Sequence, residues 1–361
     1  MGKVDIAKID KKFDLTENVF GNEELTRYRI PDRNFSLHGV FLDENEGFVR
    51  MPVSVAKTVS PGVEHLNHDT SGGRLCFSTD SKRLELSVTY DYIWPMQHMT
   101  LLASSGFILI KDTPYGRRFV KIFPPSFKDE TGFTSLINLD GDGMANYILY
   151  FPLYGRVKSL SIGLDKIANV ATFKAYRNIS PIIYYGSSIT QGGCASRPDN
   201  SYPAFIERKN RIDFINLGFS GNGKGEKTMR EYISSINCSL FVCDFNHSGI
   251  PIKDLLENHI EVYRAFRSKN PLTPILILSK THILDDKKTD NSEREKIILD
   301  TYLSAVSSGD KNVYFLSGHD MFDKSVNQFV TVDTDHPTDL GFYLMAEKIY
   351  AKMCEISPLF K

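Results

Sequence analysis

The stretch Ile182-Ile-Tyr-Tyr-Gly-Ser-Ser-Ile-Thr-Gln-Gly-Gly193 determines the fold of the C-terminal half of the chain. An apolar run of strand length passes at Gly186 into a loop rich in glycine and serine, and a helical pattern begins at Tyr202. The same order of strand, loop and helix recurs about five times from Pro181 onwards, which predicts a parallel sheet with helices on both faces.

The expected elements follow from this rhythm of apolar runs and amphipathic stretches. We expect strands at 182–185, 213–217, 240–244, 275–279 and 313–316, and helices near 202–209, 226–234, 252–267, 292–307 and 340–354. In such a sheet, ligands bind beyond the carboxyl ends of the strands, so the loops that follow the strands are the place to look for chemistry.

The first half of the chain has a different pattern. Short segments of alternating apolar and polar residues are separated by turn residues every ten or so positions, which is typical of an antiparallel sandwich. The segments are 47–53, 74–78, 83–90, 107–110, 118–123, 146–151 and 157–164, and no long amphipathic helix is evident among them. We therefore expect two domains, a β-sandwich over residues 1–178 and an α/β domain over residues 179–361.

Composition excludes several classes of protein. The 361 residues carry a formal net charge of −1, so the chain has no basic field to hold a nucleic acid. No apolar run approaches a membrane span, and the N-terminus lacks the apolar core of a secretory signal. The five cysteines form no CxxC pair, which argues against a disulfide framework or a zinc knuckle. We expect reduced thiols, a cytoplasmic location and no membrane partner.

Two loops carry a candidate nucleophile and its base. Ser188 follows the first parallel strand beside glycines that allow a tight turn, and a serine needs an adjacent base to react. His336 and Asp333 lie three residues apart before the last helix, so the carboxylate can orient the imidazole. Asp335 is a competing orienting carboxylate, and Cys194 is a competing nucleophile with no evident cation besides Arg197 to lower its pKa.

Acyl transfer also needs hydrogen-bond donors for the developing oxyanion. The backbone N–H groups of Ser188 and Gly221 are two candidates, because both residues lie in loops at strand ends. The third donor is Asn246 or Ser248, and we favour Asn246 because a side-chain amide is the better fixed donor. His247 is a candidate lining residue.

Other polar positions have competing interpretations. Arg197 either binds an anionic or hydroxylated substrate or holds its own loop. His65, His68 and Asp69 lack a third cluster that would complete a metal site. The stretch 138–143 begins like a calcium loop but has Leu149 where a bidentate Glu is needed, so we interpret it as a hairpin turn. We expect no cofactor and no metal.

Four sequence blocks together resemble the SGNH (GDSL-like) hydrolase superfamily. Residues 186–190 look like its GDSIT block, 216–221 like its glycine block, 244–248 like its asparagine block and 333–337 like its DxxHP block. The stretch 191–203 further resembles a subgroup with an N-terminal β-sandwich marked by a GxDLY motif. Here only Gly106 of that motif survives, and Ser187 replaces the usual aspartate before the nucleophile.

The resemblance implies a three-layer α/β/α, flavodoxin-like hydrolase domain behind a jelly-roll-like sandwich. It also implies a serine esterase with Ser188, His336 and Asp333 as catalytic triad, acting on short-chain acyl esters, chiefly O-acetyl groups on carbohydrate. The expected partner is thus a small-molecule or oligosaccharide ester, whereas the oligomeric state is not specified. Two alternatives are an acyltransferase with the same triad and a carbohydrate-binding protein with a degenerate hydrolase domain.

Overall fold

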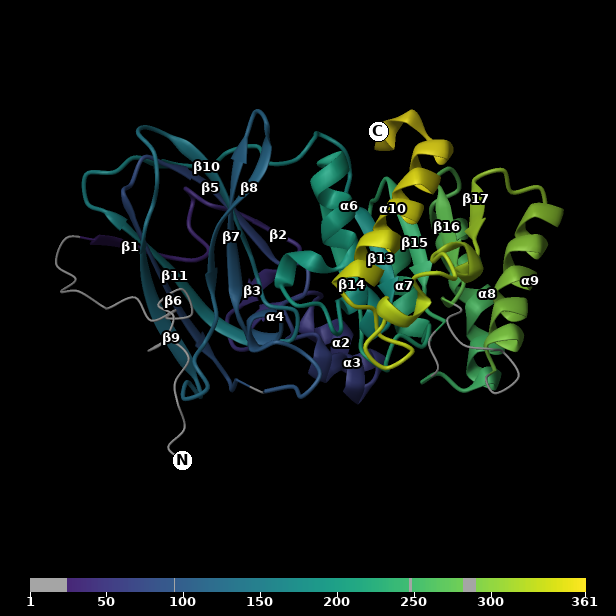
Figure 1. Ribbon diagram of the computed structural model, residues 1–361. Helices are drawn as coiled ribbons and strands as arrows, with labels where there is room; N and C mark the ends of the chain where they lie inside the picture. Colours follow the sequence, from purple (N-terminus) through teal and green to yellow (C-terminus); the bar gives the residue numbers. More distant parts are fainter. Residues whose placement is uncertain (1–24, 94, 247–248, 282–289) are drawn as a thin grey trace.

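The computed structural model describes residues 25–93, 95–246, 249–281 and 290–361. Figure 1 shows an antiparallel β-sandwich beside a parallel sheet flanked by helices, with the C-terminal helix in front of that sheet. Trp94, His247 and Ser248 lie outside the described residues, as does the stretch 1–24.

The parallel sheet has five strands in the order β14-β13-β15-β16-β17, and every neighbouring pair is parallel. The strands are β13 (Ile182–Gly186), β14 (Phe214–Gly218), β15 (Leu240–Asp244), β16 (Ile275–Leu278) and β17 (Val313–Leu316). Their sequences are mainly apolar because both faces of the sheet are buried, although Asn216 interrupts β14. The predicted strands agree with these bounds to within one residue at each end.

The helices cover the two faces of this sheet. They are α6 (Tyr202–Asn210), α7 (Lys227–Ser235), α8 (Ile252–Lys269), α9 (Asn291–Ser307) and α10 (Asp339–Ile356). Tyr184 packs in one core cluster with α6 and α10, whereas its strand neighbours Ile183 and Tyr185 pack in another with α7, α8 and α9. The expected three-layer α/β/α arrangement is confirmed.

The N-terminal region forms two antiparallel sheets. One has the order β1-β11-β6-β9, and the other has the order β12-β5-β10-β7-β8 with β2 also paired to β5. Their bounds are β1 (Leu25–Arg29), β2 (Ser36–His38), β5 (Arg74–Thr79), β6 (Arg83–Tyr90), β7 (Phe107–Thr113), β8 (Gly116–Phe123), β9 (Gly132–Asn138), β10 (Ala145–Tyr150), β11 (Val157–Asp165) and β12 (Val170–Ala171). A separate hairpin joins β3 (Phe41–Asp43) to β4 (Gly47–Val49).

The central strands of the second sheet, β5, β10 and β7, are mainly buried on both faces. In β7, Leu109 points into the core between the two sandwich sheets, whereas Ile108 and Ile110 belong to the core cluster that also contains α6 and α10. Short helices α2 (Val53–Val59), α3 (Pro61–Leu66) and α4 (Leu101–Ser105) complete the contact region. Because the two halves share this core, their division at residues 178 and 179 stays a prediction.

One local prediction differs from the structure. The turn at 138–143 is not a hairpin, because β9 pairs with β6 in one sheet and β10 pairs with β5 and β7 in the other. The turn therefore carries the chain from one layer of the sandwich to the other. Among the helices that the structure describes, none combines the length and apolarity that a membrane crossing requires.

Candidate active site

Ser188 begins a single helical turn, α5 (Ser188–Gln191), directly after β13. Ser187 caps this turn by accepting a hydrogen bond from the Ile189 N–H on its side chain, at 3.4 Å. The close turn needs Gly186, because a Cβ there would collide with the Thr190 hydroxyl and the Asp244 backbone. The arrangement places Ser188 at the carboxyl edge of the parallel sheet, with 9% of its surface exposed.

His336 and Asp333 meet Ser188 at this edge. The Ser188 Oγ lies 2.8 Å from Nε2 of His336, and Nδ1 of His336 lies 2.7 Å from Oδ2 of Asp333. The other carboxylate oxygen of Asp333 accepts the backbone N–H of His336 at 2.7 Å. The structure thus brings all three predicted residues together in one continuous hydrogen-bonded row.

The loop that holds His336 is a tight turn. Thr334 has a φ of 72°, which is uncommon for a β-branched residue, and the Val332 N–H donates to the His336 carbonyl at 2.9 Å. Asp335 points elsewhere, because its carboxylate lies 3.0 Å from the Lys280 ammonium. Of the two carboxylates next to the histidine, Asp333 is therefore the one that contacts the ring.

The pKa of Asp333 lies below its ordinary value. Partial burial alone would raise it, but the hydrogen bonds from the His336 backbone N–H and ring outweigh that effect. Asp333 is consequently a carboxylate that can accept a hydrogen bond from the Nδ1–H group of His336. This bond leaves Nε2 unprotonated and free to take a proton from Ser188.

Two backbone N–H groups at the carboxyl end of the parallel sheet are available as donors, one of Ser188 itself after β13 and one of Gly221 after β14. Within the described part of the chain, neither the Ser188 N–H nor the Gly221 N–H donates a hydrogen bond. Gly221 has a φ of 66°, and nothing lies within 4 Å of the position where its Cβ would be. The conformation and the open space both suit a donor that a ligand can approach.

Asn246 is engaged inside the protein. It is 4% exposed, and its amide donates to the Leu278 carbonyl at 2.8 Å and to the Asp244 carboxylate at 3.3 Å. Both amide hydrogens are thus used, the second in a long bond. Its role as third oxyanion donor stays a prediction, and the rival donor Ser248 and the predicted lining residue His247 lie outside the described residues.

Arg197 is held by its own loop. Its guanidinium forms a bidentate pair with Asp199, at 3.0 Å from Nε and 2.9 Å from Nη2, and it lies 5.8 Å from the centre of the Phe119 ring. Asp199 is fully buried and also pairs with Arg208. These contacts favour the loop-holding interpretation of Arg197 over a role in substrate binding.

Cys194 lies in the same loop but has the properties of an inert thiol. It is 7% exposed and adopts a φ of 74°, and burial together with the nearby Asp333 raises its pKa to about 12. A thiol with this pKa holds almost no thiolate at neutral pH, and only the thiolate is a good nucleophile.

The sandwich reaches the site with residues that the sequence did not single out. The ring of the exposed His98 lies 6.3 Å from the ring of His336. A Cβ on Gly193 would lie 3.0 Å from the Tyr154 hydroxyl and 3.4 Å from Cδ2 of His336, so Tyr154 is also close. No local motif identifies these residues, because their place depends on how the two halves pack.

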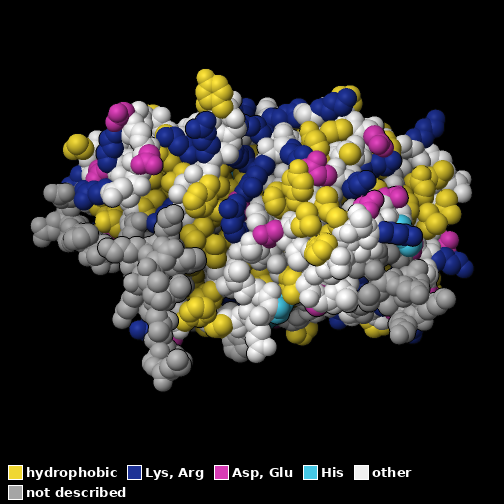
Figure 2. Space-filling view, in the orientation of Figure 1, with side chains coloured by type: hydrophobic (Ala, Val, Ile, Leu, Met, Phe, Trp, Pro, Cys, Tyr) yellow, Lys and Arg dark blue, Asp and Glu magenta, His cyan; other side chains and the backbone are white. Residues whose placement is uncertain are grey.

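Exposed apolar side chains lie on the loop of His336 and on the helix that follows it. Figure 2 shows them gathering over α6 and α10 and continuing onto the sandwich. The exposed members on the loop and on α10 include Phe329, Val332, Leu340 and Tyr343. The edge of the site is therefore apolar on the side of the α/β region.

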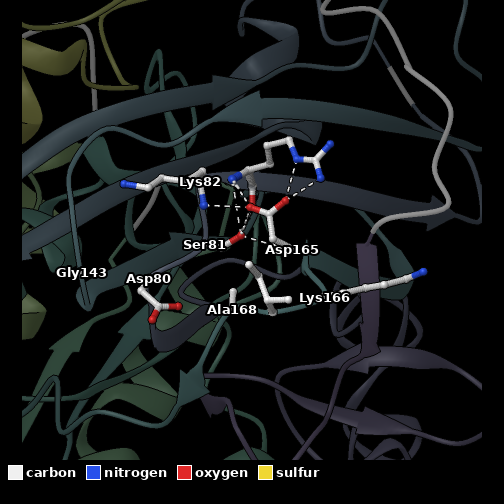
Figure 3. Close-up of a pocket in the computed structure, with 9 residues that line it drawn as sticks. Asp80, Ser81, Lys82, Gly143, Asp165, Lys166 and Ala168 are labelled. Atoms are coloured by element: carbon white, nitrogen blue, oxygen red, sulfur yellow. Dashed lines mark hydrogen bonds and ion pairs between the residues drawn. The ribbon is translucent and has the colours of Figure 1, made fainter.

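A pocket of about 650 Å³ lies in the sandwich, at loops beside β5, β6 and β11 (Figure 3). One of its charged groups, Asp165, accepts hydrogen bonds from Arg83 Nε at 2.7 Å, from the Ser81 hydroxyl at 2.9 Å and from the Lys82 backbone N–H at 2.9 Å. These bonds join β11 to the loop between β5 and β6, so the cluster has a structural role there.

Two family models match the chain. Residues 179–354 match the family described as GDSL-like lipase/acylhydrolase, and residues 27–170 match the family described as the N-terminus of the SGNH hydrolase type of esterase. No curated protein sequence matches the chain significantly.

Several solved structures have the same fold over nearly their whole length. A protein from Bacteroides ovatus described as a GDSL-like lipase is 27% identical, with a TM-score of 0.82 over 92% of this chain and 98% of the other. A salicylyl-acyltransferase from a tetracycline biosynthetic pathway is 19% identical, with a TM-score of 0.77 over 93% and 98%. A family two carbohydrate esterase from Clostridium thermocellum, solved with cellohexaose, is 14% identical, with a TM-score of 0.60 over 89% and 98%. At the two lower identities the likeness concerns the fold.

Proposed function

Because the chain belongs to the SGNH family of GDSL-like esterases and acylhydrolases, we propose that it cleaves short-chain acyl esters, chiefly O-acetyl esters of carbohydrates, with Ser188 as nucleophile. The observation that carries this proposal is the row of hydrogen bonds from Ser188 through His336 to Asp333, at 2.8 and 2.7 Å. This is the geometry that activates a serine in unrelated hydrolases.

The reaction divides into two acyl transfers. The Ser188 Oγ attacks the ester carbonyl while Nε2 of His336 takes its proton, and the same proton then goes to the leaving alkoxide. Water attacks the acyl-enzyme in the second half, and His336 again accepts a proton and returns it to the Ser188 oxygen. Asp333 holds the ring in the required tautomer and stabilises its charged form.

The oxyanion of each tetrahedral intermediate would be held by the N–H groups of Ser188 and Gly221. Both are backbone donors in loops fixed by neighbouring strands, so they need little reorganisation during the reaction. The Asn246 amide could add a third bond by exchanging its long contact with Asp244 for one to the substrate.

The choice of substrate rests on the fold and on two sandwich side chains near the triad. A family two carbohydrate esterase shares the fold over 89% of this chain. The sandwich also places His98 and Tyr154 near His336, where they could bind the alcohol part of an ester. A screen of acetylated mono- and oligosaccharides, measured by acetate release, identifies the carbohydrate.

Replacing the nucleophile tests the reaction itself. We expect Ser188→Ala to lower kcat on p-nitrophenyl acetate by at least ~10³-fold, as removal of a triad member does in other hydrolases. Labelling by a fluorophosphonate probe should disappear in the same variant. Turnover close to that of the wild type would refute the proposal.

Acyl transfer to an alcohol is the second candidate function. The same fold occurs in a salicylyl-acyltransferase, and the triad chemistry is identical up to the acyl-enzyme. Adding competing alcohols and measuring ester product against free acid distinguishes the two reactions. The third expectation, a binding protein without activity, has no support from the site, where the serine, histidine and aspartate are present and hydrogen-bonded.

A further inference from the structure

The side chain of Gln191 joins three parts of the molecule. It is fully buried at the end of α5, three residues after Ser188. Its carbonyl oxygen accepts the Ser220 N–H at 3.0 Å, and its amide nitrogen donates to Asp69 at 3.0 Å and to the Leu153 carbonyl at 3.2 Å. Asp69 and Leu153 belong to the sandwich, whereas Ser220 directly precedes the proposed oxyanion donor Gly221.

The direction of these bonds fixes the orientation of the Gln191 amide. An amide has one oxygen, which accepts hydrogen bonds, and one nitrogen, which donates them. When the oxygen of Gln191 accepts from the Ser220 N–H, its nitrogen points the other way and needs acceptors there. Asp69, which is 4% exposed, supplies such an acceptor. A sandwich residue therefore helps to determine where the backbone beside Gly221 lies.

Arg50, another residue of the sandwich, binds the same segment through its backbone carbonyls. The Arg50 guanidinium donates to the carbonyls of Asn216 at 3.2 Å and Gly218 at 2.5 Å, and it lies 4.4 Å from the centre of the Phe219 ring. It also attracts the Asp69 carboxylate. The segment from 216 to 220 is thus attached to the sandwich through its carbonyls and, by way of Gln191, through one N–H.

We propose that Asp69 is a positioning residue, which aligns the Gly221 N–H for the oxyanion by orienting the Gln191 amide. This inference rests on the proposed function and extends it, because it makes catalysis by the α/β region depend on a hydrogen-bond acceptor in the sandwich. The acceptor atom is what matters, so an amide oxygen at position 69 can replace the carboxylate.

The structure provides a matched control. The Ser71 hydroxyl also comes from the sandwich and donates to the backbone carbonyl of Gln191 at 2.5 Å. Ser71→Ala removes this bond, together with the bond that the Ser71 hydroxyl accepts from the Asn216 amide at 3.2 Å, without changing the acceptor of the Gln191 amide. If Asp69 only helped the two halves to pack, the two variants would have similar effects.

The experiment compares Asp69→Ala, Asp69→Asn and Ser71→Ala in the full chain with p-nitrophenyl acetate. Misplacing one oxyanion donor should lower kcat of Asp69→Ala on the order of 10- to 100-fold, with KM nearly unchanged. Asp69→Asn and Ser71→Ala should stay close to the wild type in kcat. An unchanged kcat in Asp69→Ala, an equal loss in Ser71→Ala, or an equal loss in Asp69→Asn would overturn the inference.

A second pair of variants covers the case in which Asp69→Ala does not fold. Gln191→Glu keeps the acceptor for Ser220 but sets two carboxyl groups against each other, so its kcat should fall. Adding Asp69→Asn supplies a donor toward the new carboxylate and should recover part of the loss; no recovery would contradict the proposed bond. Ser188→Ala is measured in the same assay. If Ser188→Ala turns over as fast as the wild type, the proposed function is wrong. If turnover depends on Ser188 but kcat is unchanged in the Asp69 variants, only this inference is wrong.

Discussion

The Oγ of Ser188 lies 2.8 Å from Nε2 of His336, although 148 positions separate the two residues. Ser188 follows β13 and His336 lies in the loop between β17 and α10, so the two are brought together by the shared carboxyl edge of the parallel sheet. Each side chain is held by its own loop. Substitutions at the triad should therefore change the chemistry more than the fold.

Asp333→Asn should lower kcat on the order of 10²- to 10⁴-fold, because an amide nitrogen facing Nδ1 would favour the wrong tautomer of His336. The matched control is Asp335→Asn, because the carboxylate of Asp335 contacts Lys280 rather than the His336 ring. Steady-state kinetics of both variants checks the assignment. A larger loss in Asp335→Asn would assign the orienting role to that residue instead.

Gly221→Ala should lower kcat while leaving KM nearly unchanged. The added methyl group has space, but a φ of 66° costs an alanine about 1–2 kcal/mol, so the backbone N–H should rotate away from the oxyanion position. Gly309→Ala is the control, since Gly309 has a φ of 88°, equal space and a position at the opposite edge of the sheet, before β17. Both variants should lose similar stability, and only Gly221→Ala should lose activity.

The parallel sheet was predictable because most of its strands contain a continuous apolar run of about four residues, such as 240–243 and 313–316, followed by a polar loop. The sandwich was predictable only as a class. The crossing at 138–143 was missed because alternation identifies a strand but does not say which sheet it joins. Strand β9 was missed because its sequence, Gly-Phe-Thr-Ser-Leu-Ile-Asn, does not alternate regularly between apolar and polar residues.

The proposed catalytic residues stand in short motifs, so the sequence could name them. Asp69 was considered only as a metal ligand beside His65 and His68, and Gln191 only as part of a family block. Their contact joins positions 122 residues apart, and it depends on how the two halves pack. A buried polar pair of this kind leaves no periodicity or spacing in a single sequence.

Cys194→Ser should keep its activity, because a thiol whose pKa is raised to about 12 by burial is not the nucleophile. Iodoacetamide should likewise leave the wild type active under conditions in which a fluorophosphonate inactivates it. Loss of turnover in Cys194→Ser, with its melting temperature unchanged, would speak for a role of the thiol in the reaction.

The buried carboxyl of Asp69 should make stability depend on pH. Burial raises its pKa to about 7, although Arg50, Gln191 and Arg156 partly offset the effect. An aspartate in an unfolded chain loses its proton near pH ~4. Between these two values the folded protein holds a proton that the unfolded chain has released, so the free energy of unfolding falls as pH rises through this window.

Asp69→Asn removes this titration and leaves the other titrating groups, including the buried Asp244, in both proteins. We therefore expect the melting temperature of the wild type, relative to that of Asp69→Asn, to be highest near pH ~5 and to fall toward pH ~8. Calorimetry of both proteins across that range measures the difference directly, and the effects of shared groups cancel in it. A difference that stays constant or grows with pH would mean that Asp69 is ionised at neutral pH, held as a carboxylate by Arg50.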